Sequence, residues 1–225
     1  MLLAVRHGSV RLTAGAAASV IAVGLISGGG GAPVSGMSWA TIVAGSLAAV
    51  AGSRLMAPGP AVAAAWRSGS AWWLPAGGRL LGAAILLAPT VAVTVAALSG
   101  RAPDWHVALA ACAVWVYATA VASVAMALAP MLGSSVSGAV ALLGVWFGGI
   151  PPSGMYEAFS TWTYVQRPLV LMWNVLPLGW RAGRWIEQGP VPDGFVIGSW
   201  ILLGVGVAAW GAVSGPLVEG QRMAS

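Results

Sequence analysis

The side chains that could carry catalytic or ligand chemistry are few in this 225-residue chain and stand far apart in the sequence. A phosphate-binding P-loop requires a lysine that reaches the phosphates, and the chain contains no lysine. A zinc site needs closely spaced cysteine, histidine or carboxylate ligands. Cys112 is the one cysteine, and the two histidines, His7 and His106, fall near opposite membrane faces in the span assignment below. We therefore predict no catalytic centre, no metal site and no cofactor.

Arginine and tryptophan gather instead in the segment Ala57–Gly78, whose prolines divide it into pieces too short to cross a membrane. Trp66, Trp72 and Trp73 with Arg67 suit a short helix at the headgroup boundary, where indole rings prefer to lie and arginine can reach water. Two interpretations stay open for this segment. It is either a connector resting on the membrane surface or a protrusion that contacts a cytoplasmic partner.

A second aromatic segment, Pro151–Gly194, contains the apolar stretch Leu169–Leu178, which is also too short to cross a membrane. Pro168 and Pro177 divide this segment, and proline is favoured at the first position of a helix. We expect short re-entrant or interfacial helices that dip into the outer leaflet. The aromatic and charged side chains available on them include Trp162, Arg167, Trp173, Trp180, Arg181, Arg184, Trp185 and Glu187.

Composition indicates which environment must hold these segments. Hydrophobic residues make up 59% of the chain and charged residues only 7%, whereas soluble domains carry about 25% charged residues. Too little charge remains to cover a water-soluble surface, so the covering must be lipid. The net charge of +5 comes without a basic cluster, which argues against binding to nucleic acid.

A hydrocarbon core of about 30 Å requires roughly 20 apolar residues of helix. With that length as the measure, we predict an all-α, polytopic bundle of about six spans that forms a single transmembrane domain over residues 1–225. The first span also resembles a signal peptide, and we prefer a retained anchor. Pro89, in the middle of the third span, predicts a kink. The predicted spans are residues 12–30, 37–57, 80–99, 105–130, 135–150 and 195–213.

Glycines at spacing four recur along the chain, and such pairs allow close approach of helix backbones in membranes. The sequence contains 32 glycines, so many pairs arise by chance. Gly144 and Gly148 in the fifth span are the best placed of them.

The orientation of the spans follows from arginine placement in short loops, because cytoplasmic flanks hold an excess of basic residues. An even number of spans puts both termini on one side. We predict that this side is the cytoplasm, which would hold Arg6, Arg11, Arg54, Arg67, Arg79 and Arg222, against Arg101, Arg167, Arg181 and Arg184 outside.

The layout of six spans, a cytoplasmic connector helix after the second and short outer helices before the sixth resembles the permease subunit of type-2 ABC exporters. The resemblance covers nearly the whole chain and implies a permease in the cell inner (plasma) membrane. It also implies a second permease, as homo- or heterodimer, and separate nucleotide-binding ATPase subunits. It assigns ATPase contact to about Ala57–Ser70, with Arg54, Trp66 and Arg67 as contacts. The implied outer gate is about Pro151–Gln188, with Trp162, Arg167, Trp173, Trp180, Arg184 and Glu187.

An exporter of this kind would work by alternating access, which requires different affinities for substrate in two states. A lining so poor in charge suits an amphipathic substrate. The competing hypothesis is a non-catalytic membrane scaffold or anchor subunit of a larger complex, which explains the scarcity of polar residues equally well.

Overall fold

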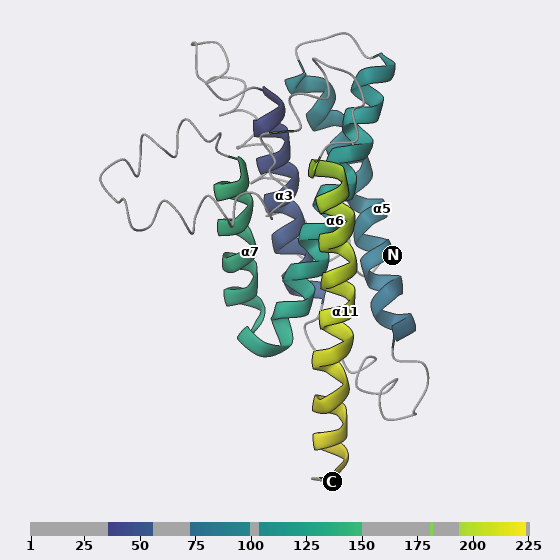
Figure 1. The fold of residues 1–225 in the computed structure, drawn as a ribbon, viewed down its shortest axis with the longest axis vertical. Helices are drawn as coiled ribbons and strands as arrows, with labels where there is room; N and C mark the ends of the chain where they lie inside the picture. The colour runs from purple at the N-terminus through teal and green to yellow at the C-terminus, as the bar shows by residue number, and fades with distance from the viewer. Residues whose placement is uncertain (1–35, 56–72, 100–103, 150–180, 182–193, 224–225) are drawn as a thin grey trace, which may run out of the picture.

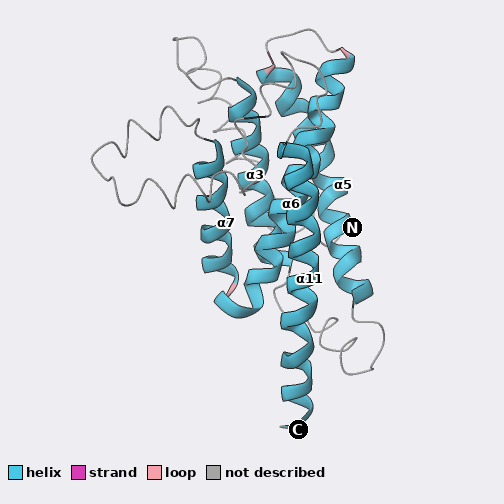
Figure 2. Ribbon diagram, viewed as in Figure 1, coloured by secondary structure: helices cyan, strands magenta, loops and turns pink. Residues whose placement is uncertain are grey.

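The computed structural model describes residues 36–55, 73–99, 104–149, 181 and 194–223. These residues form five helices and no strand, so the prediction of an all-α chain is confirmed for the part of the chain that is described (Figure 2). The helices are α3 (Gly36–Leu55), α5 (Trp73–Leu98), α6 (Trp105–Leu132), α7 (Ser134–Gly149) and α11 (Gly194–Met223). The first predicted span, residues 12–30, lies outside the described residues.

Two of these helices are long and apolar enough to cross a membrane: the portion Gly77–Leu98 of α5 and the whole of α6. The apolar parts of the other two later helices, Ser134–Gly149 and Phe195–Trp210, are shorter.

Helix α5 begins earlier than the sequence predicted. We expected the third span to start at Leu80, after a connector that reached Gly78, but the helix starts at Trp73. Pro75 lies in its first turn, where backbone N–H groups have no helical acceptor, so a proline costs no hydrogen bond there. Arg79 therefore lies inside the helix. At the other end of the chain, α11 continues to Met223, beyond the predicted end at residue 213.

Helix α6 is the centre of the bundle and packs against all four other helices. Half of its side chains are buried, and most of the buried ones are alanines. Because alanine adds little bulk, neighbouring backbones can approach α6 closely, and in membranes such van der Waals packing takes the place of a hydrophobic driving force between helices. Helix α3 also packs against α5 and α7.

Successive helices run in alternating directions (Figure 1). Helix α3 ends, α5 begins and α11 ends at the lower end of the bundle in that view, which we call the arginine end because Arg54 and Arg79 lie there. Helix α6 begins and α7 ends at the opposite end, which we call the Asp104 end. A single residue, Gly133, with φ of 78°, joins α6 to α7 in the left-handed region that favours glycine.

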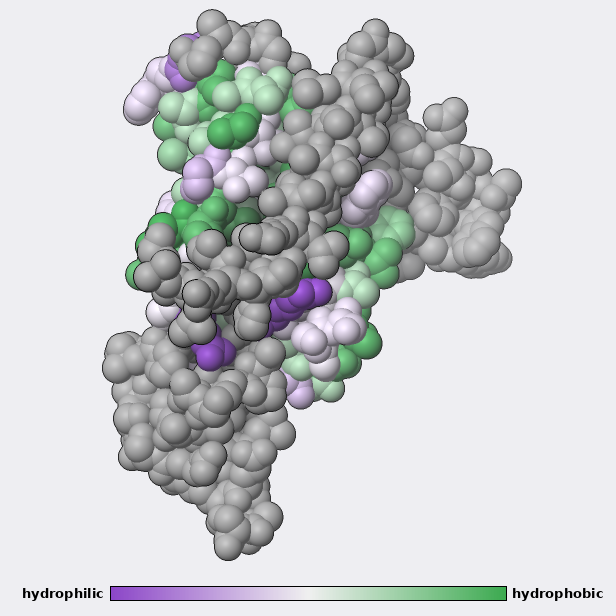
Figure 3. Space-filling model, turned by 180° about the vertical axis from the view of Figure 1, so that it is seen from behind, coloured by the Kyte–Doolittle hydropathy of each residue, from purple (hydrophilic) through white to green (hydrophobic). Residues whose placement is uncertain are grey.

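The outer surface of the described helices is apolar over large areas. Leucine, isoleucine, valine and tryptophan side chains are exposed on α5, α7 and α11, with Leu81 62% exposed and Ile201 61% exposed. On the face seen in Figure 3, strongly hydrophilic residues occupy only small patches among the described residues. Large contiguous apolar surfaces of this kind mark contact with another protein or a membrane.

Candidate functional site

Charged side chains on the described helices lie near the helix ends. Arg54 is exposed in the last turn of α3, and Arg79 lies within the first two turns of α5. Asp104 caps the start of α6 by accepting a 2.8 Å hydrogen bond from the backbone N–H of Val107. Glu219 and Arg222 occupy the last two turns of α11. The middle portions of the described helices therefore contain no aspartate, glutamate, histidine or arginine that could relay a proton or bind an ion.

Buried hydroxyl groups in the bundle bond to their own helices. Ser123 Oγ donates to the carbonyl of Ala120 at 2.7 Å, and Ser199 Oγ donates to the carbonyl of Phe195 at 2.7 Å. Thr94 does the same with Thr90 one turn back. Such local bonds satisfy the hydroxyls without a partner on another helix. Among these residues the hydroxyls thus provide no polar path across the bundle.

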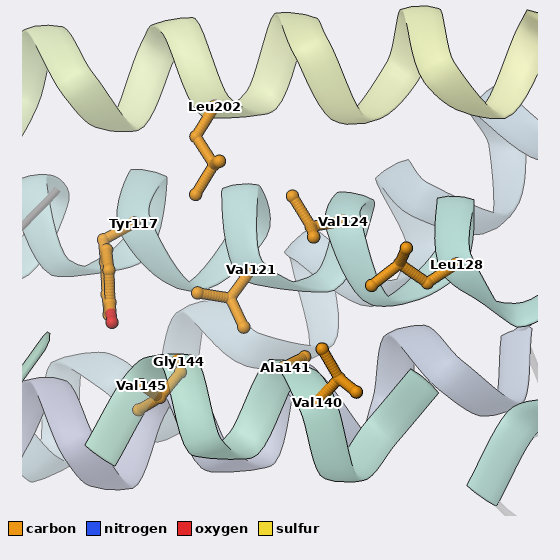
Figure 4. Close-up of a pocket in the computed structure, with 9 residues that line it drawn as sticks. All are labelled: Tyr117, Val121, Val124, Leu128, Val140, Ala141, Gly144, Val145 and Leu202. Atoms are coloured by element: carbon orange, nitrogen blue, oxygen red, sulfur yellow. The ribbon is translucent and has the colours of Figure 1, made fainter. Parts of the chain in front are cut away.

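Among the described residues, a recess lies between α7 and α11, with α6 as its floor (Figure 4). Its cavity volume is about 130 Å³. The floor consists of four bulky side chains of one α6 face, and we call the whole feature the α6 groove. Its lining is Tyr117, Val121, Val124 and Leu128 from α6, Val140, Ala141, Gly144 and Val145 from α7, and Leu202 from α11.

The floor is buried at one end of the groove and more exposed at the other. Tyr117 and Val121 are buried, whereas Val124 and Leu128 are half-buried. The Tyr117 ring packs 5.3 Å, between ring centroids, from Phe195 of α11, and on its other side it meets Gly45 of α3. The groove is therefore closed near the middle of α6 and opens toward the turn between α6 and α7.

The remaining contacts of the bundle depend on small residues. A β-carbon added to Gly52 of α3 would lie 2.7 Å from Cα of Ala122, and one added to Gly206 of α11 would lie 3.0 Å from the backbone carbonyl carbon of Ser123. Both glycines thus mark close backbone approaches to α6. The expectation that Gly144 serves this purpose is wrong within the described residues, because an added β-carbon there would meet nothing within 4 Å. Gly144 borders the groove instead.

One polar contact joins α5 to α6 beside the proline of α5. The indole N–H of Trp115 donates to the carbonyl of Ala84 at 2.7 Å. Pro89 lacks an N–H, which leaves the carbonyl of the next residue, Ile85, without its helical donor. Helix α5 nevertheless continues through Pro89 to Leu98. Trp115 thus ties α5 to α6 at the turn that the proline weakens.

Of the residues predicted to contact an ATPase, Arg54 is described, and it lies exposed at the arginine end. Trp66 and Arg67 lie outside the described residues. The same holds for the predicted outer gate residues Trp162, Arg167, Trp173, Trp180, Arg184 and Glu187. Arg181, from the same segment, is described and is half-buried.

Sequence analysis missed the α6 groove, although a signal for it exists. In an alanine-rich helix, Tyr117, Val121, Val124 and Leu128 follow one another at spacings of four, three and four, which places bulky side chains on one face.

No cluster of three or more histidine, cysteine, aspartate or glutamate side chains suitable for a metal ion occurs among the residues that the structure describes. The described helices offer packing surfaces and an apolar recess. Comparison with protein-family models, curated proteins and solved structures gave no match to this chain.

Proposed function

We propose that the chain is the membrane-spanning permease subunit of an ATP-driven exporter. In this proposal it forms a pathway for an amphipathic substrate by alternating access, in the plasma membrane, with both termini in the cytoplasm. A separate ATPase subunit and a second permease complete the working unit. The proposal has two parts, membrane placement and transport, which rest on different observations and have separate tests.

Membrane placement is supported by the exposed apolar side chains of α5, α7 and α11 together with the location of charge. Arg54 and Arg79 lie at one end of the bundle, and Asp104 caps α6 at the other. An excess of arginine marks the cytoplasmic side of membrane helices. The arginine end then faces the cytoplasm, and the exposed apolar belt between the two ends faces lipid.

Cys112 allows a direct test of this placement. It is a free, exposed cysteine on α6, eight residues into the helix. Lipid should cover it, so we expect a charged maleimide added to membrane sheets open on both faces to alkylate Cys112 at least tenfold more slowly than after denaturation. Ser135→Cys in a Cys112→Ala background is the control, because Ser135 is exposed next to the α6–α7 turn. Rapid labelling of Cys112 at the rate of the control position would contradict membrane placement.

The transport proposal is supported by the positions of the helix ends next to the predicted connector and next to the predicted outer gate. Leu55, just before the predicted connector, and Trp73, where α5 begins within it, lie at the arginine end. Gly149 and Gly194, which flank the predicted outer gate, lie at the opposite end. A connector on the cytoplasmic side and a gate on the outer side is the arrangement that the exporter resemblance requires. Arg54, exposed beside the connector, is then available to an ATPase.

Co-purification tests the transport proposal. We would purify the chain in mild detergent from its native membrane and identify stoichiometric partners by mass spectrometry. A nucleotide-binding ATPase is expected, and the double substitution Arg54→Ala with Arg67→Ala should release it. Arg101→Ala, predicted on the opposite face, is the matched control and should retain the ATPase. Stoichiometric partners that include no ATPase would exclude the exporter.

A scaffold subunit is the second candidate, favoured by one specific observation. The buried hydroxyls of Thr94, Ser123 and Ser199 bond to their own helices, and the described helices carry no charge in their middle portions. A scaffold needs only such packing surfaces. Co-purification with cofactor-bearing or structural membrane subunits, in place of an ATPase, would support it.

A further inference from the structure

We propose that the α6 groove binds one acyl chain of a phospholipid from the surrounding bilayer. The chain would lie along α6 with its methyl end against Tyr117 and its ester end near the α6–α7 turn. This inference rests on the membrane placement proposed above and does not depend on transport.

The length of the groove fits one chain in one leaflet. Its floor extends from Tyr117 to Leu128, which corresponds to about 16 Å along an α-helix that rises 1.5 Å per residue. Half of a hydrocarbon core about 30 Å thick is about 15 Å. Tyr117 is near the middle of α6, and Leu128 is one turn from its end at Leu132. The groove thus follows the path of a lipid chain from the membrane surface to the bilayer centre.

The chemistry of the lining favours hydrocarbon over water. The groove is lined by the Tyr117 ring, by aliphatic side chains and by Gly144, which has no side chain. The Tyr117 hydroxyl is the one polar group among these side chains. A bound water needs two to four polar partners, and apolar cavities of about 150 Å³ stay dry and accept hydrocarbon ligands. The groove has a cavity volume of about 130 Å³, which lies in that range. Hydrocarbon is therefore the occupant that its walls can stabilise.

The shape of the groove favours an acyl chain over another helix. An α-helix with side chains is about 10–12 Å across, too wide for a recess of about 130 Å³. The recess opens sideways between α7 and α11, where Val140 is 45% exposed at its rim. A narrow, flexible chain can enter through that side.

The α6–α7 turn offers a suitable level for the lipid headgroup. Gly133, Ser134 and Ser135 are exposed there, next to the open end of the groove. In the orientation proposed above this turn faces the cytoplasm, because α6 runs from the Asp104 end toward the arginine end. The bound phospholipid would then belong to the inner leaflet.

Photocrosslinking tests the inference in reconstituted vesicles. The probe is a phosphatidylcholine with a diazirine either near the methyl end or near the ester end of one chain, and mass spectrometry locates the labelled residues. The methyl-end probe should label the Tyr117–Val121 stretch and Val145. The ester-end probe should label Leu128 and Val140. Equal labelling of the groove and of exposed apolar faces such as that of α5, with either probe, would mean ordinary bulk lipid and would overturn the inference.

A blocked groove gives the matched comparison. Gly144→Leu places a bulky side chain at the groove, and its added β-carbon meets nothing within 4 Å, so the helix should tolerate it. Gly82→Leu makes the same change at a glycine of α5 that also has open space and does not line the groove. We expect labelling near Tyr117 to fall at least fivefold with Gly144→Leu and to stay unchanged with Gly82→Leu. Equal labelling in both variants would overturn the inference.

Two further outcomes are distinguishable. A photoreactive amino acid placed at Val140 that crosslinks to a second copy of this chain, in place of lipid, would overturn the inference and assign the groove to a dimer contact. Failure of the groove labelling while Cys112 stays protected from the charged maleimide would remove the lipid site alone. Membrane placement and the exporter proposal would then still stand on their own tests.

Discussion

Helix α6 meets its neighbours in two contrasting ways. Toward α3 it presents Ala122, against which Gly52 packs backbone to backbone, and nothing larger than a hydrogen fits between them. Toward α7 and the part of α11 around Leu202 it presents Tyr117, Val121, Val124 and Leu128, and a groove remains, although α11 closes onto Ser123 at Gly206. Small side chains thus give the tighter contact, because two backbones can touch along a line, whereas bulky side chains hold the neighbouring helices apart. Helix α6 thus packs backbone to backbone against α3 on one face and forms the floor of the groove on another face.

The largest effect is expected at the tight contact. In Gly52→Ala the new β-carbon would lie 2.7 Å from Cα of Ala122, and backbone atoms cannot rotate away. Overpacking of this kind costs about 1–3 kcal/mol, and we expect the upper part of that range. The measurement is thermal stability in detergent, followed by the loss of monodisperse protein on size-exclusion chromatography. Gly82→Ala, with open space around it, is the control. Equal stability of the two variants would show that α3 and α6 are not in backbone contact.

A smaller effect is expected where α11 crosses α6. In Gly206→Ala the β-carbon meets Ser123, whose hydroxyl group can move, although the backbone of Ser123 lies 3.0 Å away. We expect a loss of about 1–2 kcal/mol in the free energy of unfolding.

Gly204, two residues earlier in the same helix, supplies an unusually close control because its added β-carbon meets nothing within 4 Å. Alanine is favoured over glycine in helices by about 1 kcal/mol, so Gly204→Ala should be neutral or stabilising. The two variants share the helix and the chemical change, so their difference in thermal stability isolates the contact with Ser123. A stability order opposite to this one would contradict the packing of α11 on α6.

The sequence predicted the positions of helices correctly where a long apolar stretch is enough to define the helix. Residues 105–130 were expected to form a span, and α6 occupies Trp105–Leu132 and is long enough to cross a membrane. Residues 135–150 were also expected to form a span; they form the helix α7 at Ser134–Gly149, which is shorter. The third span was expected to begin at Leu80, after the charged Arg79, whereas α5 begins at Trp73. Pro75 does not prevent this earlier start, because proline is tolerated in the first turn of a helix. The residue at which a helix begins or ends depends on single side chains, whereas the existence of the helix depends on the apolar character of its whole length.

The pairing of helix faces could not be predicted in the same way. Glycine spacing favoured Gly144, yet close contacts form at Gly45, Gly52, Gly138, Gly149 and Gly206. A glycine pattern shows where a helix has no side chain, but it does not show which helix packs there. The packing partner depends on how all the helices of the bundle are arranged. The groove arises from the same cause: its floor is visible in the spacing of Tyr117 and the residues after it, but its walls come from two other helices.

The smallest effect is expected at the contact between α5 and α6, which is a hydrogen bond rather than a packed joint or a groove. Trp115→Phe removes the indole N–H that donates to the Ala84 carbonyl at 2.7 Å. Hydrogen bonds between membrane helices average about 0.6 kcal/mol, and the Ala84 carbonyl keeps its place in the ladder of α5. We therefore expect a loss of about 0.5–1 kcal/mol in thermal stability measurements.

The control for this variant is Trp105→Phe, because Trp105 is 70% exposed at the start of the same helix. Both substitutions remove an indole, but Trp115 also packs against the core, so the difference between the two variants is an upper limit for the interhelical bond. A loss at Trp115 as large as that for Gly52→Ala would mean that the bond secures the turn beside Pro89. In that case the Trp115–Ala84 hydrogen bond would stabilise the packing around α6 as much as the contacts of its small residues do.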